Sequence, residues 1–259
     1  MRRIAIYGKG GIGKSTTTAN VTAALAYRGL KVMQIGCDPK ADSTKLLTGG
    51  EQIPTVLQTI RDDSDPELED IVHEGVFGSL CVECGGPKPG VGCAGRGIIA
   101  AFEKLEELDV IGTYHPDVIL YDVLGDVVCG GFAMPIRNGY ARDVFVVTSG
   151  EMMSLYAANN IAEAVKDMSE DGYARMNGLI LNSRNVENEL ENVLQAAKEM
   201  GTGVMHVIPR DPIVQKCEAM GKTVVAAAGD SPQAANYKEL AFKMYTNTEN
   251  IGGGMKLGE

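Results

Sequence analysis

Short hydrophobic runs alternate with helical patterns along most of the chain. The runs are rich in Val, Ile and Leu and predict buried strands at residues 4–7, 31–36, 118–122, 144–148, 178–182 and 204–208. The stretches between them predict helices at residues 15–27, 98–108, 155–168, 187–200 and 232–247. Such an alternation is typical of a mainly parallel sheet with helices on both faces. We therefore expect an α/β fold that binds its ligands at the carboxyl ends of the strands.

Two stretches lack this alternation. Residues 51–75 are acidic and partly helical, and residues 81–97 contain many glycines together with two prolines, which predicts a loop. We find no internal repeat and no linker, so we expect one domain at residues 1–247. The remaining residues, 248–259, include a run of glycines and predict a flexible C-terminal tail.

Composition narrows the classes of function. The chain has 259 residues, of which 44% are hydrophobic, enough for a large core, and its formal net charge is −10. An acidic surface argues against non-specific nucleic-acid binding and against a basic membrane anchor. Without a long apolar run or a leader, we expect a cytoplasmic protein with neither nucleic acid nor membrane as a partner. Its six cysteines are then reduced thiols or metal ligands rather than disulfides.

The first hydrophobic run leads into a glycine-rich loop at Gly8 to Ser15, which fits the pattern G-x-x-x-x-G-K-(S/T). Glycines let several backbone N–H groups turn towards one anion, and the following helix adds the positive end of its dipole. In this pattern Lys14 reaches the β- and γ-phosphates and Ser15 holds Mg²⁺. The order strand, loop, helix supports nucleoside triphosphate binding. The predicted loop residues are Gly8, Lys9, Gly10, Gly11, Ile12, Gly13, Lys14, Ser15 and Thr16.

Two acidic residues each follow a predicted strand that borders this loop. Phosphoryl transfer uses one carboxylate near Mg²⁺ and one near the attacking water. We assign Asp38 to water activation and Asp122 to the outer shell of the metal, with a strand-end turn or a helix cap as the alternative for each. Lys9 is an additional loop cation that could stabilise charge on a partner subunit, as an arginine finger does, or could be a solvated surface lysine.

Two cysteines are surrounded by glycine, Cys93 within residues 90–97 and Cys129 within residues 126–131. Backbone amides can approach a sulfur ligand closely there, and such hydrogen bonds tune iron–sulfur clusters. Their spacing is not that of a ferredoxin, so a buried small-residue role is the alternative. Cys129 lies seven residues after Asp122, within about 25 Å of extended chain. A segment that senses the terminal phosphate could therefore move a cluster ligand.

Taken together, these motifs resemble the nitrogenase iron protein family. The likeness covers nearly the whole chain and is carried by residues 8–15 with Lys9, 36–44, 90–97, 121–135, 149–152, 182–184 and 209–211. The resemblance implies a homodimer in which Cys93 and Cys129 of both subunits hold one 4Fe-4S cluster, while each subunit binds ATP and Mg²⁺. It also implies a ferredoxin or flavodoxin as electron donor and a larger catalytic reductase as electron acceptor.

The resemblance assigns further roles by position. Lys9 acts across the dimer interface, Lys40 lies near the phosphates, and Asn182 and Asp211 lie near the adenine. Residues 122–129 form the switch that connects nucleotide state to the cluster. Arg96 matches an arginine that in some members faces the partner protein and can be ADP-ribosylated.

The sequence also departs from the family. Cys84 stands where genuine nitrogenase iron proteins commonly have serine, so Cys81 and Cys84 form a C-x-x-C pair. With Cys93 and Cys129 the chain has four candidate ligands, and an intrachain cluster or a zinc site is an alternative to the shared cluster. The chain also ends soon after its last predicted helix. Both features resemble the nitrogenase-like reductases, including the component that supplies electrons to a nickel-tetrapyrrole cyclase in methanogens.

Three functions follow as hypotheses. The first is an ATP-driven electron carrier for nitrogenase or for a nitrogenase-like reductase. The second is a positioning ATPase, of the kind that partitions plasmids or places the division septum; it shares the two-lysine loop but needs a basic DNA-binding face or an amphipathic tail. The third is a carrier that assembles and hands over metal clusters. Iron content and reversible redox cycling of a stable cluster distinguish them.

Overall fold

A computed structural model describes residues 1–63, 65–86, 94–125, 134–137, 139–170 and 172–250. Within these residues eight strands form one sheet in the order β3-β4-β2-β5-β1-β6-β7-β8. All neighbouring strands are parallel except β3 and β4. The α/β prediction is confirmed. The strands are β1 (Arg2–Tyr7), β2 (Val32–Cys37), β3 (His73–Glu74), β4 (Leu80–Glu83), β5 (Val118–Val123), β6 (Asp143–Thr148), β7 (Arg175–Asn182) and β8 (Val204–Ile208).

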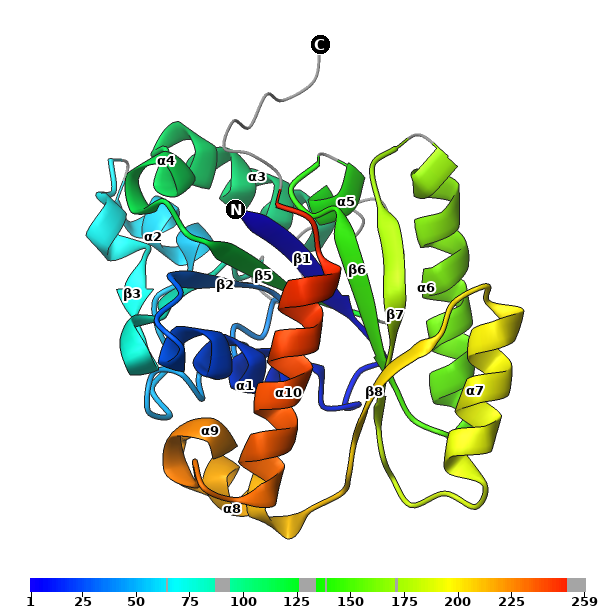
Figure 1. Cartoon of the computed structure of the whole chain (residues 1–259). Helices are drawn as coiled ribbons and strands as arrows, with labels where there is room; N and C mark the ends of the chain where they lie inside the picture. The colour runs from blue at the N-terminus through cyan, green and yellow to red at the C-terminus, as the bar shows by residue number, and fades with distance from the viewer. Residues whose placement is uncertain (64, 87–93, 126–133, 138, 171, 251–259) are drawn as a thin grey trace.

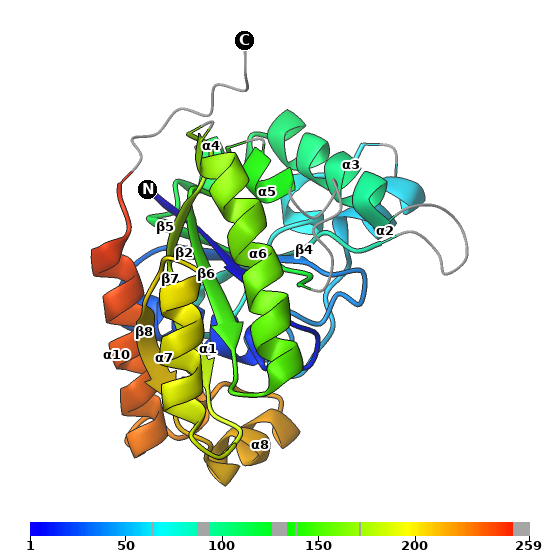
Figure 2. The same cartoon turned by 90° about the vertical axis from the view of Figure 1, so that its right-hand side faces the viewer.

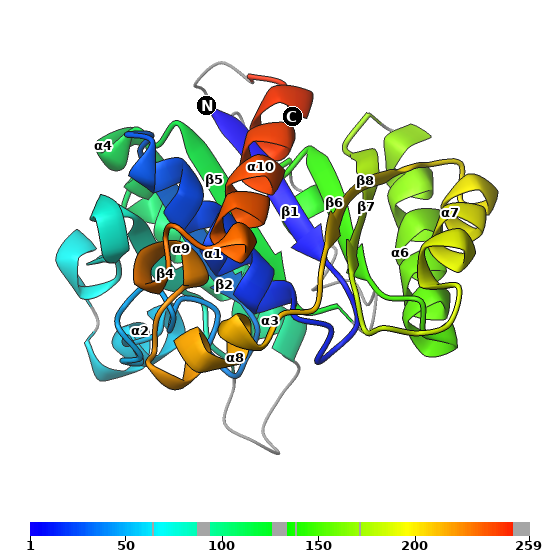
Figure 3. The same ribbon diagram turned by 60° about the horizontal axis from the view of Figure 1, so that its bottom comes forward.

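Helices cover both faces of this sheet (Figures 1 and 2). One face is covered by α1 (Lys14–Tyr27), α8 (Pro212–Ala219), α9 (Val224–Ala227) and α10 (Pro232–Asn247), and Figure 3 shows α10 lying along α1. The other face is covered by α2 (Val56–Asp62), α3 (Ala94–Glu107), α4 (Val110–Tyr114), α5 (Met134–Arg137), α6 (Met152–Glu170) and α7 (Glu189–Glu199).

The central strands are hydrophobic at nearly every position because both of their faces are buried. In β1, Ile4 and Ile6 belong to the core beneath α1 and α10, whereas Ala5 and Tyr7 belong to the core beneath α3 and α6. Side chains alternate between faces along a strand, so a strand at the centre of two layers needs apolar residues in consecutive positions. This explains why the strand predictions were largely correct.

The prediction of a loop starting at residue 81 is wrong at its beginning, because Leu80–Glu83 form β4 beside β2. The run is short and ends in a charged residue, so its pattern alone does not indicate a strand. Glu83 is nevertheless completely buried, and its carboxyl group accepts hydrogen bonds from the backbone N–H and hydroxyl of Thr44. Tertiary hydrogen bonds thus make a buried glutamate possible here.

Other differences concern helix boundaries. Helix α3 begins at Ala94 rather than at 98, and α8 is an additional helix. The sequence of α8 carries a recognisable start signal. The Asp211 side chain caps the helix by accepting a hydrogen bond from the backbone N–H of Ile213, and Pro212 occupies the first helical position. Helix α10 has the predicted bounds.

The predicted tail lies mostly outside the described residues. Of its first residues, Thr248 is buried and its hydroxyl donates to the carbonyl of Met244. In the described part of the chain, no helix has both the length and the apolar character needed to cross a membrane.

Candidate functional site

The glycine-rich loop connects β1 to α1 at the carboxyl end of the sheet. Gly8, Gly11 and Gly13 have positive φ angles of 152°, 73° and 94°. A Cβ on Gly8 would lie 2.4 Å from the carbonyl oxygen of Val147, and one on Gly13 would lie 2.4 Å from Asn182 Nδ2. Both the backbone conformation and the available space therefore require glycine at residues 8 and 13.

Helix α1 begins directly after this loop. Gly13 is its N-cap and, having no side chain, offers no acceptor to the first turn. No acidic residue occupies that turn either. The amide N–H groups of the turn and the positive end of the helix dipole are therefore directed towards the space in front of the loop, which suits an anion such as a phosphate.

Lys14 and Asp122 form a buried ion pair at this end of the sheet. Lys14 Nζ lies 3.1 Å from Asp122 Oδ1, and the side chains are 8% and 0% exposed. Burial lowers the pKa of Lys14, but nearby carboxylates, Asp122 foremost, outweigh it and raise the pKa overall. Apart from this ion pair, the two Asp122 oxygens have no hydrogen-bond partner within the described chain. A carboxylate held this way can still accept hydrogen bonds from the water shell of a metal ion.

Asp38 follows β2 directly and lies on the same side of the sheet. Its carboxylate accepts a hydrogen bond of 2.9 Å from the backbone N–H of Lys40, and its carbonyl accepts from the N–H of Ala41. Asp38 thus stabilises the turn after β2, which was the alternative considered for it. It also borders the open space in front of the loop together with Lys40 and Asp42.

That open space is a cavity of about 640 Å³. Its wall brings together the carboxyl ends of several strands, the glycine-rich loop and the start of α8. Among the residues predicted from the sequence, it includes Gly10, Gly11, Gly13, Lys14, Ser15, Thr16, Asp38, Lys40, Asn182 and Asp211. The roles assigned to these residues remain predictions, but they lie around one cavity of suitable size for a nucleotide.

Two segments that are distant in sequence, the chain around the end of β7 and helix α8, form hydrogen bonds with the glycine-rich loop and the first turn of α1. Asn182 Nδ2 donates to the carbonyl of Ile12 at 2.7 Å, and Arg184 Nη2 donates to the carbonyl of Gly11 at 2.7 Å. On α8, Glu218 accepts a 2.5 Å hydrogen bond from the hydroxyl of Thr16. The sequence prediction did not include Arg184 or Glu218, since no local motif marks a residue that supports a loop through its carbonyls.

Lys9 is not among the residues that line this cavity. It borders an adjacent hollow of about 350 Å³, which shares Gly10, Gly11, Arg184 and Arg210 with the cavity and is also lined by Glu151 and Ser154. In the described part of the chain no carboxylate lies within ion-pairing distance of Lys9. The two lysines of the loop thus differ in the described chain: Lys14 is buried and paired with Asp122, whereas Lys9 is half-buried and borders the adjacent hollow.

The two glycine-flanked cysteines, Cys93 and Cys129, lie outside the described residues, and so do residues 126–129 of the predicted switch. The described residue before that segment, Gly125, packs against the glycine-rich loop. A Cβ on Gly125 would lie 1.6 Å from the carbonyl oxygen of Gly8. Arg96 lies in the first turn of α3 and is exposed.

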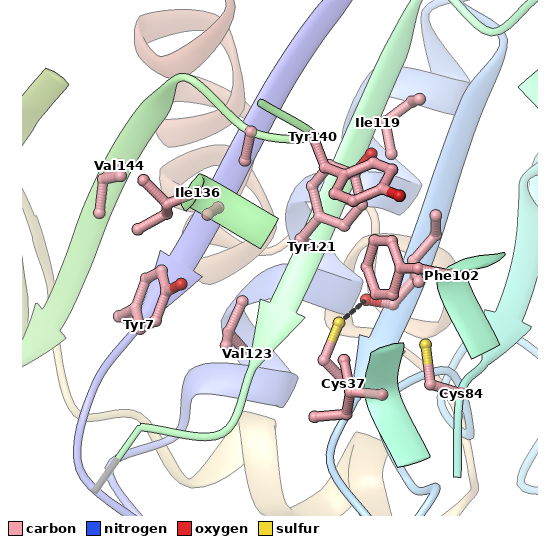
Figure 4. Packing of buried hydrophobic residues seen from close by; sticks show 14 of the residues in the cluster. Tyr7, Cys37, Cys84, Phe102, Ile119, Tyr121, Val123, Ile136, Tyr140 and Val144 are labelled. Carbon is pink, nitrogen blue, oxygen red and sulfur yellow. Dashed lines mark hydrogen bonds between the residues drawn. The ribbon is translucent and has the colours of Figure 1, made fainter. Parts of the chain in front are cut away.

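The C-x-x-C pair does not converge on one point. Cys81 belongs to the core beneath α1, whereas Cys84 belongs to the core on the opposite face of the sheet. Cys84 lies beside Cys37 instead (Figure 4), and the Cys84 thiol together with burial raises the pKa of Cys37. In the described chain no group of three or more His, Cys, Asp or Glu side chains is placed to hold a metal ion.

Glu83 is a further buried acid near the cavity. Burial raises its pKa to about 8, although the hydrogen bonds from Thr44 act in the opposite direction. Its second oxygen, Oε2, has no hydrogen-bond partner in the described chain, and a Cβ on Gly36 would lie 2.0 Å from it. Sequence reasoning missed Glu83 because its strand was predicted as a loop.

A glycine-rich loop between a strand and a helix, with a lysine facing a strand-end aspartate in a parallel sheet, defines the P-loop NTPase class. Solved structures agree on the fold. The cell division ATPase MinD of Pyrococcus furiosus has a TM-score of 0.73 at 22% identity, covering 95% of this chain and 99% of that one. A ParA family ATPase from Chlorobium tepidum has a TM-score of 0.69 at 18% identity, covering 93% and 98%.

The sequence comparisons narrow this class further. The family model described as 4Fe-4S iron sulfur cluster binding proteins, NifH/frxC family, matches residues 2–253. A nitrogenase iron protein of Methanospirillum hungatei is 54% identical over 255 residues, which cover 97% of this chain and 90% of that protein. The chain belongs to the NifH/frxC family.

Proposed function

We propose that the protein is an ATP-dependent iron–sulfur reductase. Two identical chains hold one 4Fe-4S cluster between them and pass single electrons, coupled to hydrolysis of MgATP, to a larger catalytic protein. Membership of the NifH/frxC family and the 54% identity with a nitrogenase iron protein support this function. The single observation that carries it is the contact between Gly125 and Gly8, since it joins the segment leading to Cys129 to the phosphate-binding loop.

The residues around the 640 Å³ cavity are suited to a nucleotide. The loop amides and Lys14 bind the phosphates, and Ser15 holds Mg²⁺, which neutralises phosphate charge when bound. Asp38 orients the attacking water, and Asp122 accepts hydrogen bonds from the metal's water shell. Apart from the ion pair with Lys14, the Asp122 oxygens have no donor in the described chain, which fits that role because a buried carboxylate needs donors. Asn182 and Asp211 lie on the adenine side, and Lys40 lies near the phosphates.

Nucleotide state reaches the cluster through the chain that leaves β5. Asp122 lies near the carboxyl end of β5, on the side of the nucleotide cavity. Gly125 contacts the backbone of Gly8, and the space between them leaves no room for a side chain. A movement of the loop when the γ-phosphate is lost therefore displaces Gly125 and the chain beyond it. Order and hinge changes of this kind connect phosphate loss to distant sites in other nucleotide switches.

Cys93 and Cys129 of both chains hold the cluster, which supplies one-electron transfer when bound. Helix α3 begins at Ala94 directly after Cys93, and the exposed Arg96 in its first turn lies on the surface that meets the catalytic partner. A ferredoxin or a flavodoxin supplies the electron. Lys9, which borders the adjacent hollow and does not line the nucleotide cavity, acts on the nucleotide of the other subunit.

Two versions of this function differ in the protein that finally accepts the electron. The protein serves either nitrogenase or another reductase, such as a nickel-tetrapyrrole cyclase; Cys84 in place of serine favours the second version. A different class, the positioning ATPase, shares the fold at TM-scores near 0.7 but requires no iron. Purifying the protein with its associated proteins, and identifying any larger cysteine-bearing reductase, distinguishes the two versions of the reductase.

The test of the proposed function is the iron content of protein purified without oxygen. We expect about four iron atoms and four sulfides for each pair of chains, with a reversible one-electron spectrum. Cys93→Ala and Cys129→Ala lose the iron, whereas the control Cys84→Ser retains it. An iron-free dimer that hydrolyses ATP would instead identify a positioning ATPase, and loss of iron in Cys84→Ser would identify an intrachain site.

A further inference from the structure

A second large cavity lies at the opposite end of the central strands, between the sheet and helices α3 and α4. Its volume is about 680 Å³, similar to that of the nucleotide cavity. Residues from the start of β1, from β5 and from the connection before β5 line it, together with one face of α3 and the first turn of α4. Figure 2 shows α3 and α4 at the end of the molecule away from α8, where the nucleotide cavity lies.

The wall of this cavity contains a buried arginine without a counter-ion. Arg3 is only 4% exposed, and in the described chain its side chain makes one hydrogen bond, which Nη1 donates to the carbonyl of Gly139 at 3.4 Å. Its Nε and Nη2 atoms have no partner, and no carboxylate of the described chain lies within 4.0 Å of it. A guanidinium does not lose its proton in a protein, so burying it without an anion is strongly unfavourable.

A second unpartnered donor lies in the same wall. Tyr121 is completely buried, and its hydroxyl makes no hydrogen bond in the described chain. Its ring stacks on Phe102 with centroids 5.8 Å apart, and Phe102 in turn contacts Tyr140 at 4.6 Å (Figure 4). The Tyr140 hydroxyl, in contrast, is occupied, since it donates to the Glu106 carboxylate. Within the described part of this wall, the Nε and Nη2 atoms of Arg3 and the hydroxyl of Tyr121 thus lack an acceptor.

The rest of the wall decides what kind of acceptor fits. Phe102, Leu105, Val110 and Ile111 provide an apolar surface. Two carboxylates, Glu106 and Asp109, also line the cavity, and Asp109 is engaged as the N-cap of α4. The remaining titratable groups of the wall are His115 and the amino group of Met1, which donates to Asn250. The two carboxylates of the wall disfavour a ligand with two negative charges. A ligand with a single carboxylate on an apolar body suits both the unpartnered donors and the apolar surface.

We infer that this cavity is a binding site for a small organic monocarboxylate. Its carboxylate accepts hydrogen bonds from the Arg3 guanidinium and the Tyr121 hydroxyl once these side chains turn towards it, and its apolar body packs against Phe102 and Leu105. Charge-assisted hydrogen bonds from arginine to a carboxylate are among the stronger polar contacts in proteins. The site shares no wall residue with the nucleotide cavity.

The test uses the full-length protein, loaded with saturating MgADP so that added anions cannot enter the phosphate-binding loop. Phenylacetate is titrated by calorimetry at concentrations up to about 10 mM, which detects a millimolar dissociation constant. We expect saturable binding of phenylacetate, and affinities about tenfold or more weaker for the neutral isostere phenylacetamide and for inorganic phosphate. Equal binding of the amide or of phosphate, or the absence of saturable binding, would overturn the inference.

Adjacent arginines supply a matched pair of variants. Arg3→Gln is expected to weaken phenylacetate binding about tenfold, whereas Arg2→Gln changes it less than about twofold, because Arg2 lies on the other face of β1 and bonds to the carbonyl of Tyr245. Tyr121→Phe removes one donor without removing charge and weakens binding about threefold to tenfold. If Arg3→Gln fails to fold, the Tyr121→Phe result decides: an unchanged affinity in that variant contradicts the site.

Discussion

Buried charged groups lie near both ends of the central strands β1 and β5, but only those at the carboxyl end are paired with an opposite charge in the described chain. At the carboxyl end Lys14 has a partner 3.1 Å away in Asp122, and the backbone of Gly125 fits against Gly8. At the amino end Arg3 is buried with no carboxylate of the described chain within 4.0 Å. The carboxyl end thus has its buried cation paired with a carboxylate, whereas the amino end has buried donors without an acceptor in the described chain. Substitutions at the two ends should therefore have opposite effects.

The largest effect is expected from Lys14→Gln. This change removes the cation that we propose binds the phosphates and leaves Asp122 buried without its partner, so we expect ATP hydrolysis to fall by about 10²–10³-fold and the free energy of unfolding to fall by about 3–5 kcal/mol. The cluster remains reducible, since Lys14 is not a cluster ligand, but electron delivery fails. ATPase assays and denaturant unfolding measure both quantities.

The control for this variant is the double substitution Lys14→Gln with Asp122→Asn. Removing both charges restores most of the lost stability but not the hydrolysis, because no buried carboxylate is then left unpaired. Normal electron delivery by Lys14→Gln would contradict ATP gating, and unchanged stability would contradict the importance of the ion pair.

The next effect concerns the backbone contact at the same end. In Gly125→Ala the new Cβ meets the carbonyl of Gly8, so the phosphate-binding loop must shift. We expect a loss of about 1–3 kcal/mol in the free energy of unfolding and about tenfold weaker ATP binding. Gly203→Ala is the matched control, since its Cβ meets no atom within 4 Å and it should change stability by less than about 0.5 kcal/mol. Equal behaviour of the two variants would show that Gly125 does not position the loop.

An effect that depends on pH is expected from Glu83. Its pKa is raised to about 8 in the folded chain, so the folded state holds this proton more tightly than the unfolded state does. Between the ordinary glutamate pKa and about pH 8, the free energy of unfolding then decreases as pH rises, by at most about 1.4 kcal/mol per pH unit. Glu83→Gln should remove this slope, and Glu74→Gln, at an exposed position, should retain it. Urea unfolding at several pH values provides the measurement; identical slopes in both variants would rule out Glu83 as the source.

The smallest expected effect has the opposite sign. Without ligand, Arg3→Met should raise the free energy of unfolding by about 1 kcal/mol, because it replaces an unpaired buried charge by an apolar side chain. Arg2→Met should lower it by about 0.5–1 kcal/mol, since Arg2 stacks on the Tyr245 ring at 3.7 Å. Thermal and denaturant unfolding compare the two. A loss of stability in Arg3→Met would mean that Arg3 already has an anion.

Much of the fold could be predicted because its signals are local. The glycine-rich loop, the strand before it and the helix after it lie within one short stretch, and the hydrophobic runs of β1, β5 and β6 mark central strands directly. The bounds of α10 were also correct, since Ser231 and Pro232 mark its start. Strand β4 was missed because its four residues end in a buried glutamate, whose partners lie on another segment.

The sequence by itself determined the class of nucleotide-binding loop, the parallel α/β architecture and the family, since each depends on short motifs or on periodicity. Only the tertiary structure decided which residues meet: Lys14 with Asp122, Gly125 with Gly8, Cys84 with Cys37 rather than with Cys81, and Arg3 with no carboxylate of the described residues. The physical reason is that parallel neighbours in a sheet come from distant parts of the chain. Strand order and register, which no local pattern encodes, therefore determine the contacts of every charged or thiol side chain at the ends of these strands.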